Sequence, residues 1–150
     1  MNITRAVAAC AIFACLAAVG YASPAWADDF SGTYTFQWDG GNAATWTVTP
    51  CGDQLDPCVH VSETGNSAAQ PWSGDAHWSV GYWSMFVDRQ DMIACDDGKK
   101  VPGRATYSWN AVTLSGTGSI FNTGVCGDEP GTLSSAFTLT KIGPAELPQS

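Results

Sequence analysis

The chain has 150 residues, with 14 Asp and Glu against six Lys and Arg, so its formal net charge is −8 at pH 7. So acidic a surface repels phosphate backbones, which excludes nucleic-acid binding, and it disfavours polybasic attachment to a membrane. Only 13% of the residues are charged, while Gly and Trp are abundant, a balance that excludes a coiled coil and an acidic disordered chain.

The first 27 residues have the pattern of an export signal. Met1–Arg5 supply a positive start, residues 6–20 form an uncharged apolar run, and Ala25-Trp26-Ala27 is a small-x-small cleavage site. A retained membrane helix is not expected, because the run is shorter than the roughly 20 residues that span a bilayer. We predict cleavage after Ala27 and a secreted or cell-envelope protein of 123 residues with net charge −9.

Alternation of apolar and polar residues with a period of two dominates the rest of the chain and predicts strands. Strands are expected over residues 33–38, 45–49, 58–63, 77–82, 83–89, 105–111, 112–121 and 133–142. The alternation places Val80 and Tyr82 inward and Trp83 outward, so the chain turns or bulges near Gly81. The polar stretch Thr64–Asp75 is predicted to be a loop.

No segment carries apolar residues at helical spacing over three turns, so the expected fold class is all-β. We predict a single domain over residues 28–142 with seven to nine antiparallel strands. A small β-barrel of meander connectivity and a β-sandwich both fit, and the succession of hairpins favours the barrel. Residues 143–150 are expected to form a flexible tail.

Four cysteines remain after the predicted signal: Cys51, Cys58, Cys95 and Cys126. An even number in an exported chain predicts disulfides that staple the domain. Of the three possible pairings we expect Cys51–Cys58, which closes a turn-like loop, and Cys95–Cys126, which closes a loop of about 30 residues. A zinc site is disfavoured because no C-x-x-C pair is present.

Residues capable of catalysis or metal binding are sparse. His60 and His77 lie on the polar faces of their strands and would face each other if those strands pair, but two imidazoles are too few for a catalytic zinc. Ser73 is the nearest candidate nucleophile, without a Gly-x-Ser-x-Gly motif around it. We expect no metal, no cofactor and no enzymatic activity; a hydrolase that uses a carboxylate or Ser73 is the alternative.

Aromatic side chains are the most informative feature, since nine of the 14 that follow the predicted signal fall on inferred inward faces. They either fill the core or line a lumen that stacks on a sugar, lipid or aromatic ligand. Trp72 and Trp83 fall off the inward pattern and are expected to be exposed contact residues. The candidate ligand-binding residues are Trp38, Trp46, Trp72, Trp78, Trp83 and Trp109.

Five strings carry a resemblance: Gly32–Phe36, Trp46–Gly52, Cys95–Gly98, Tyr107–Ala111 and Phe137–Lys141. With them, most of the chain after residue 27 resembles small exported proteins of mycobacteria and related actinobacteria with no assigned function. The resemblance implies an exported or cell-envelope protein and transfers no site residues.

The expected function is a non-enzymatic binding or interaction module that uses aromatic side chains. Its partner would be a small-molecule, glycan or lipid ligand, or an envelope protein; the oligomeric state is left open. A structural or host-facing surface protein is a further alternative.

Overall fold

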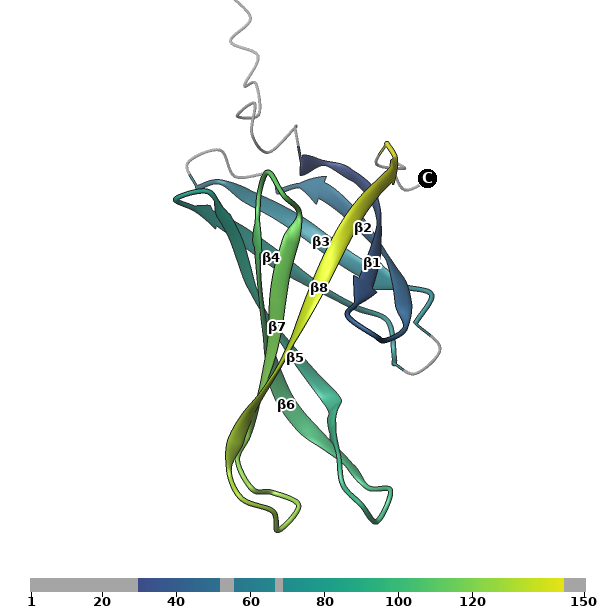
Figure 1. Cartoon of the computed structure of the whole chain (residues 1–150), viewed down its shortest axis with the longest axis vertical. Coiled ribbons are helices and arrows are strands. Elements are labelled where there is room, and N and C mark those ends of the chain that lie inside the picture. The colour runs from purple at the N-terminus through teal and green to yellow at the C-terminus, as the bar shows by residue number, and fades with distance from the viewer. Residues whose placement is uncertain (1–29, 52–55, 67–68, 145–150) are drawn as a thin grey trace, which may run out of the picture.

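The structure, a computed structural model, describes residues 30–51, 56–66 and 69–144 and contains eight antiparallel strands (Figure 1). The strands are β1 Gly32–Trp38, β2 Ala43–Pro50, β3 Cys58–Thr64, β4 Trp72–Ser79, β5 Tyr82–Ala94, β6 Lys100–Asn110, β7 Ser115–Asn122 and β8 Gly131–Gly143. Each strand pairs with the next along the chain, and β8 pairs with β1, so the sheet closes into a barrel. The predicted all-β fold is confirmed, and of the two architectures considered it is the barrel.

The period-two alternation explains why these segments pair in this register. On β1, Tyr34 and Phe36 are buried, while Thr33 and Thr35, which alternate with them, lie on the outer face. On β2, Trp46 and Val48 are buried, and Trp46 stands opposite Tyr34. A shift of one residue would bring these four apolar side chains to the solvent, so burial fixes the pairing.

Aromatic rings fill the interior of the barrel. Trp46 is fully buried, and its ring lies 4.6 Å from Phe36, 5.4 Å from Trp109 and 5.7 Å from Tyr107, measured between centroids. Offset and edge-to-face arrangements of this kind each add about 0.5–1.5 kcal/mol beyond the burial of area. Around Trp46 the interior of the barrel is therefore a packed core.

The connection between β4 and β5 corrects the predicted face of three residues. Val80 and Gly81 form a two-residue hairpin turn with φ values of 48° and 85°, as tight turns between twisted strands require. Val80 is 87% exposed and Tyr82 52% exposed, whereas Trp83 is 1% exposed. The expectation that Val80 and Tyr82 point inward and Trp83 outward is wrong, because the turn restarts the alternation.

The polar stretch before His77 was also misassigned by the sequence pattern. Strand β4 begins at Trp72, so the last four residues of the predicted loop over Thr64–Asp75 belong to a strand. Ser73 and Asp75 occupy the outer face of β4, and the inward position between them is Gly74. Polar outer residues and a glycine made a half-buried strand look like a loop.

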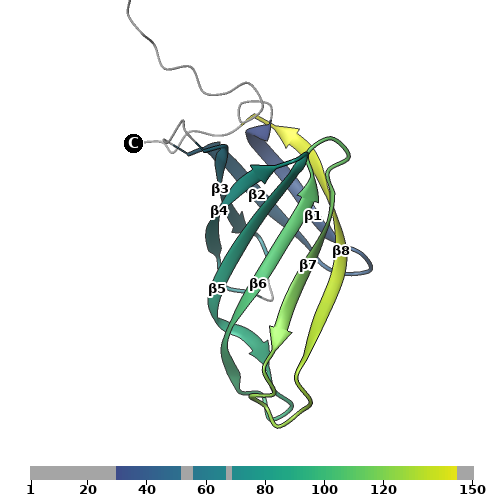
Figure 2. The same ribbon diagram turned by 90° about the vertical axis from the view of Figure 1, so that its left-hand side faces the viewer.

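The strands β5 to β8 continue beyond the barrel. β4 pairs with β5 only over Tyr82–Ser84, and β1 pairs with β8 no further than Phe137. Towards their turns the β5–β6 hairpin and the β7–β8 hairpin therefore project as two arms, residues 88–104 and 119–134 (Figures 1 and 2). Met85, Val87 and Ala105, next to the first arm, are still buried in the core of the barrel.

Both predicted disulfides are confirmed. Cys95 and Cys126 join the tips of the two arms, with Cα atoms 5.4 Å apart. Cys51 and Cys58 join β2 to β3, with Cα atoms 5.2 Å apart. One bridge therefore holds the arms together, and the other closes a connection at the barrel.

The predicted signal over residues 1–27 lies outside the described residues, as do residues 145–150 of the predicted tail. Gly143 belongs to β8, so the ordered strand extends one residue past the predicted end of the domain. Among the described residues, no helix is long and apolar enough to cross a membrane.

Candidate functional site

The structure divides the six candidate tryptophans into two groups. Trp46, Trp83 and Trp109 are at most 1% exposed and Trp72 is 9% exposed, so all four belong to the core. The expectation that Trp72 and Trp83 are exposed contact residues is wrong; Trp72 stacks on the Tyr107 ring at 5.4 Å. Trp38 and Trp78 are half-buried and line hollows at opposite ends of the barrel.

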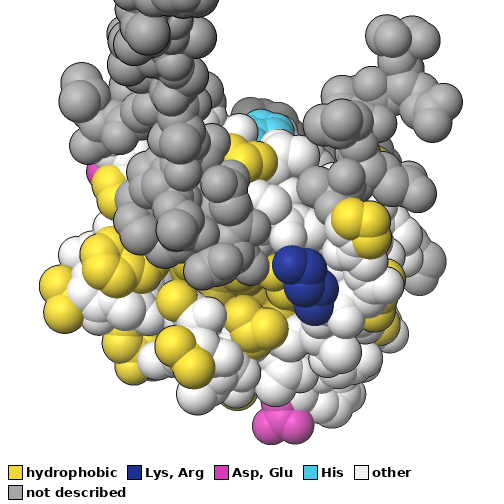
Figure 3. Space-filling view, turned by 90° about the horizontal axis from the view of Figure 1, so that it is seen from above, with side chains coloured by type: hydrophobic (Ala, Val, Ile, Leu, Met, Phe, Trp, Pro, Cys, Tyr) yellow, Lys and Arg dark blue, Asp and Glu magenta, His cyan; other side chains and the backbone are white. Residues whose placement is uncertain are grey.

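The end of the barrel away from the arms is occupied by Phe30. The Phe30 ring lies 4.9 Å from Tyr34 and 5.5 Å from Trp83, and the Tyr34 hydroxyl donates a hydrogen bond to the Phe30 carbonyl at 2.8 Å. Hydrophobic side chains gather over this end of the molecule (Figure 3), where Val80 and Val112 are exposed. A hollow of about 320 Å³ remains at this end, and Phe30, whose ring packs against Tyr34 and Trp83, is one of the residues that line it.

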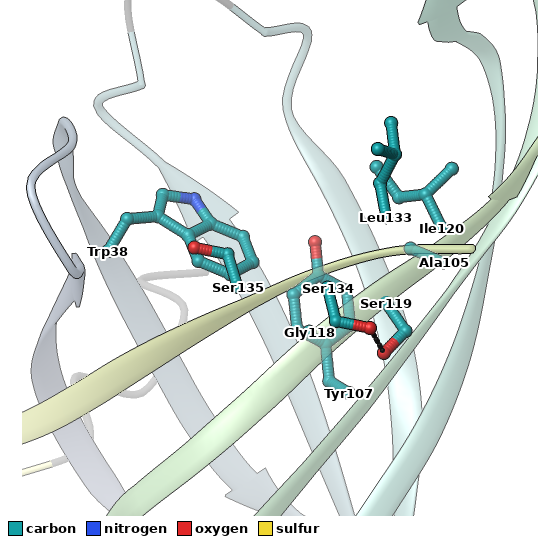
Figure 4. Close-up of a pocket in the computed structure, with 9 residues that line it drawn as sticks. All are labelled: Trp38, Ala105, Tyr107, Gly118, Ser119, Ile120, Leu133, Ser134 and Ser135. Carbon is teal, nitrogen blue, oxygen red and sulfur yellow. Dashed lines mark hydrogen bonds between the residues drawn. The ribbon is translucent and has the colours of Figure 1, made fainter. Parts of the chain in front are cut away.

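A second hollow, the arm-end pocket, opens where the barrel meets the arms (Figure 4). Its volume is about 180 Å³. Trp38, at the end of β1, lies on one side, Ile120 and Leu133 from the second arm lie on the other, and Tyr107 of β6 lies between them (Figure 4). The full lining is Trp38, Ala105, Tyr107, Gly118, Ser119, Ile120, Leu133, Ser134 and Ser135.

A glycine makes room for the indole in this pocket. A methyl group on Gly118 would run into the six-membered ring of Trp38, with Trp38 Cζ3 only 2.9 Å away and Tyr107 Cε1 3.3 Å away. Such separations are shorter than van der Waals contact. Gly118 therefore lets Trp38 lie flat across β7 and form one wall.

The floor and rim of the pocket are mainly apolar. Ile120 and Leu133 occupy inward positions on β7 and β8, but no further strand in the described part of the chain covers them, and Leu133 stays 68% exposed. Ser119 and Ser134 share one hydrogen bond, Oγ to Oγ, at 2.8 Å, so one hydroxyl of the two donates to the other. The other polar side-chain groups of the lining are the Ser135 hydroxyl, the Tyr107 phenol and the Trp38 indole.

The hydroxyl of Tyr107 is a polar group in the lining of the pocket. Burial, reinforced by the Glu63 carboxylate, raises the pKa of Tyr107, while the Arg89 guanidinium acts in the opposite direction. The phenol is therefore neutral at physiological pH and can donate or accept one hydrogen bond. This arrangement suits the binding of a neutral group and offers no base or acid matched to neutral pH.

Glu63 is a buried polar residue that the sequence reasoning missed. Its side chain is 4% exposed; Oε2 accepts a hydrogen bond from Trp46 Nε1 at 3.0 Å, and Oε1 accepts one from Asn66 Nδ2 at 3.4 Å. The period-two run Val59, Val61 and Glu63 would have placed it inward. The carboxylate satisfies the indole of Trp46 and fixes that ring in the core.

Ser73, the nucleophile of the alternative hydrolase hypothesis, lies on the outer face of β4. It stands opposite Ser62, and among the described residues its hydroxyl has no hydrogen-bond partner. His77 is four residues further along the same strand, about 13 Å away at the rise of a β-strand. The histidine nearest to it in sequence therefore cannot act on Ser73.

His60 and His77 do not face each other as the sequence suggested. In the β3–β4 register His60 stands opposite Asp75, and His77 stands opposite Cys58. Each imidazole has a carboxylate partner: His60 Nδ1 lies 2.6 Å from Asp75 Oδ1, and His77 Nδ1 lies 2.9 Å from Asp56 Oδ2.

The sulfur atoms of Cys51 and Cys58 lie within 4.8 Å of an Asp75 carboxylate oxygen. The two sulfurs are bonded to each other, so neither is a thiolate that could bind a metal ion. This trio is no metal site in the oxidised protein.

No family model, no curated protein and no solved structure matches the chain. The resemblance to small exported mycobacterial proteins therefore stays a prediction, and the geometry alone supports a function.

Proposed function

We propose that the chain is an exported, non-enzymatic binding module whose arm-end pocket takes an apolar group, either a single ring or a short acyl segment. The observation that supports it is the pocket with Trp38 on one side, Ile120 and Leu133 on the other, and Tyr107 between them (Figure 4). An exposed leucine beside a half-buried indole leaves apolar surface that a guest would remove from water.

The size of the pocket limits the guest. A cavity of about 150 Å³ holds one benzene molecule, and the arm-end pocket is of similar volume, about 180 Å³. A guest of six to eight heavy atoms binds with about −4 to −6 kcal/mol, which corresponds to a Kd from tens of micromolar to about 1 mM.

The chemistry of the surroundings narrows the class of ligand. The net charge of −8 disfavours anionic guests such as fatty acids. A glycan needs several donors and acceptors, whereas the lining is mainly apolar, and of its three serines Ser119 and Ser134 share a hydrogen bond with each other. We therefore favour a neutral lipid or aromatic ligand over a sugar.

The extracellular assignment belongs to the same proposal. Two disulfides are consistent with an oxidising compartment, and the pattern of residues 1–27 supports export. Neutral lipids and aromatic small molecules of the cell envelope are the ligands such a protein would meet.

Tryptophan fluorescence during titration with a neutral medium-chain alcohol and with a neutral phenol tests the proposal. A parallel titration with a soluble glucan tests whether the protein binds a sugar instead. Leu133→Ser should weaken binding about tenfold, because one buried leucine contact of about 1.5 kcal/mol is lost. Ile142→Ser is the matched control, since Ile142 lies on the same strand, is 60% exposed and does not line the pocket. Equal effects of the two substitutions, or saturation with glucan alone, would contradict the proposal.

A further inference from the structure

The outer edge of β8 is free along the second arm. β1 pairs with β8 no further than Phe137, and the Asp39 N–H then donates to the Ala136 carbonyl at 2.9 Å, where the contact between the two ends. No strand in the described part of the chain pairs with this edge over residues 131–135, and all of these residues are exposed. Figure 2 shows this stretch at the margin of the sheet, with β7 on its other side.

Two hydrogen bonds show which backbone groups point outward along this edge. The Ala136 carbonyl is bonded on the β1 side, whereas the Leu139 N–H donates at 2.9 Å to the carbonyl of Leu114, which directly precedes β7. Along a strand the N–H and C=O of successive residues point alternately to the two sides. The ladder to β7 has no register shift. The N–H and C=O of Thr132 and Ser134 therefore point away from β7, towards solvent.

This edge lacks the features that protect the other free edges of the sheet. Sheet edges are kept from pairing by charged side chains, proline, bulges or shortness. β5 carries Asp88 and a register shift after Arg89 where β4 no longer pairs with it, and β6 contains Pro102. Residues 131–136 carry no charge, no proline and no register shift, and Leu133 adds an exposed apolar side chain. Among the free edges of the described strands, this one is the most open to pairing.

The two ends of the free stretch limit which strand can pair there. A strand that continued past Ser135 would meet the end of β1, because Asp39 already occupies the Ala136 carbonyl. The same stretch of a second copy, laid antiparallel, is short enough to fit. It begins after Pro130, which has no N–H to add to a ladder. The length of the free edge therefore favours a second copy over a longer foreign strand.

An antiparallel pair with its two-fold axis at Leu133 satisfies the free backbone groups. Thr132 of one copy then stands opposite Ser134 of the other, and the two residues exchange both of their N–H···O bonds. Leu133 stands opposite its own counterpart, so an exposed leucine of each copy is removed from water. The paired stretch is uncharged, so two acidic chains meet where their mutual repulsion is weakest.

We propose that the protein pairs with a second copy of itself through the outer edge of β8, residues 131–135, and forms a symmetric dimer. The pairing uses backbone groups that an apolar guest in the arm-end pocket does not need, so it goes beyond the proposed function. So short an edge buries less than the roughly 1,200–2,000 Å² of stable interfaces, and the dimer is therefore weak.

Sedimentation equilibrium of the protein purified after export, from about 10 µM to about 1 mM, tests the pairing. We expect a monomer–dimer equilibrium, with tighter association at higher salt because both copies are acidic. A two-fold pairing closes on itself, so no larger species should form. A monomer at every concentration, or assembly that continues beyond the dimer, would overturn the proposal.

The variant Thr132→Pro separates the pairing from the pocket. The Thr132 N–H points away from β7, so proline removes a donor from the free edge and leaves the ladder of the arm intact. Thr132 does not line the arm-end pocket. We expect the dimer to dissociate about tenfold more readily, since each copy loses a donor, while binding of a medium-chain alcohol is unchanged. Self-association equal to that of the unaltered protein would refute the role of this edge.

Cysteine cross-linking tests the position of the two-fold axis. Opposite residues that do not hydrogen-bond to each other have Cα atoms about 4.5 Å apart, within the range of about 4.4–6.8 Å that a disulfide spans. Leu133→Cys should therefore form a disulfide-linked dimer under mild oxidation. Ser135→Cys is the matched control on the same face, because Ser135 would lie about 13 Å from its own counterpart. Cross-linking of Ser135→Cys as fast as that of Leu133→Cys, or none in either variant, would refute the proposed register.

Discussion

Removal of the two disulfides in separate double variants, Cys95→Ala/Cys126→Ala and Cys51→Ala/Cys58→Ala, should destabilise the protein by different amounts. The bridges link residues 31 and 7 positions apart. Chain entropy lost by the unfolded state then gives about 3.7 kcal/mol for the long loop and about 2.4 kcal/mol for the short one. The difference, about 1.3 kcal/mol, depends only on the ratio of loop lengths.

The long bridge should also have a local effect that the short one lacks. From Arg104 towards its tip the first arm does not pair with β7, because the ladder joins only Ala105–Trp109 of β6 to Gly116–Ile120 of β7. Without Cys95–Cys126 the arm tips are held by their own hairpins alone. Amide hydrogen exchange should accelerate over residues 92–101 and 121–132 and stay unchanged in β1 to β3.

Guanidinium unfolding followed by tryptophan fluorescence measures the global effect, and hydrogen exchange with mass spectrometry measures the local one. The free energy of unfolding should fall with guanidinium concentration at a similar slope in both variants, so their transition midpoints report their stabilities. An equal loss in the two variants, a larger loss for the short loop, or unchanged exchange in the arm tips would refute this account of what holds the arms.

Three further predictions concern the core and the pocket. Glu63→Ala should lower the free energy of unfolding in guanidinium by about 2–4 kcal/mol, because it leaves the Trp46 indole N–H buried without an acceptor. Glu63→Gln keeps an acceptor and should lower it less. A smaller loss of stability in Glu63→Ala than in Glu63→Gln would contradict this role. Burial raises the pKa of Tyr34 to about 12, so the unfolded chain releases this proton first and stability should fall between pH 10 and 12; a Tyr34→Phe variant whose stability falls as steeply over that range would disprove the link. Gly118→Ala should push the indole at the end of β1 into solvent, red-shift the emission and abolish pocket binding, whereas Gly131→Ala, with no atom within 4 Å of the added methyl, should change neither.

Most of the barrel could be predicted because each strand is half-buried. Tyr34 and Phe36 on β1, and Trp46 and Val48 on β2, alternate with outward threonines, and burial on one face leaves one acceptable register. The disulfides could be predicted for a related reason, since Cys51 and Cys58 flank a turn and leave Cys95 and Cys126 to pair.

The pattern failed where a single residue changes the face. The turn at Val80 and Gly81 restarts the alternation, and a valine at positive φ gives no turn signal. Trp72 looked like part of a loop because Ser73 and Asp75 on its strand face water. Both errors concern tryptophans, and both placed on the surface a ring that the structure buries.

The pocket could not be predicted because it depends on contacts between distant segments. Trp38 and Leu133 line one pocket only because β8 continues beyond the end of its partner β1 and carries the second arm past the barrel. The His60–Asp75 pair likewise depends on the β3–β4 register, which places the two residues opposite each other. Sequence spacing carries neither piece of information.

The central proposal is that an apolar group binds in the arm-end pocket. Chemical-shift mapping on isotopically labelled protein during titration with a neutral medium-chain alcohol tests it most directly. We expect the shifts to be concentrated at the Trp38 indole N–H and the methyl groups of Ile120 and Leu133. Shifts confined to the opposite end, around Phe30 and Trp78, or no saturable shift at the pocket, would contradict it.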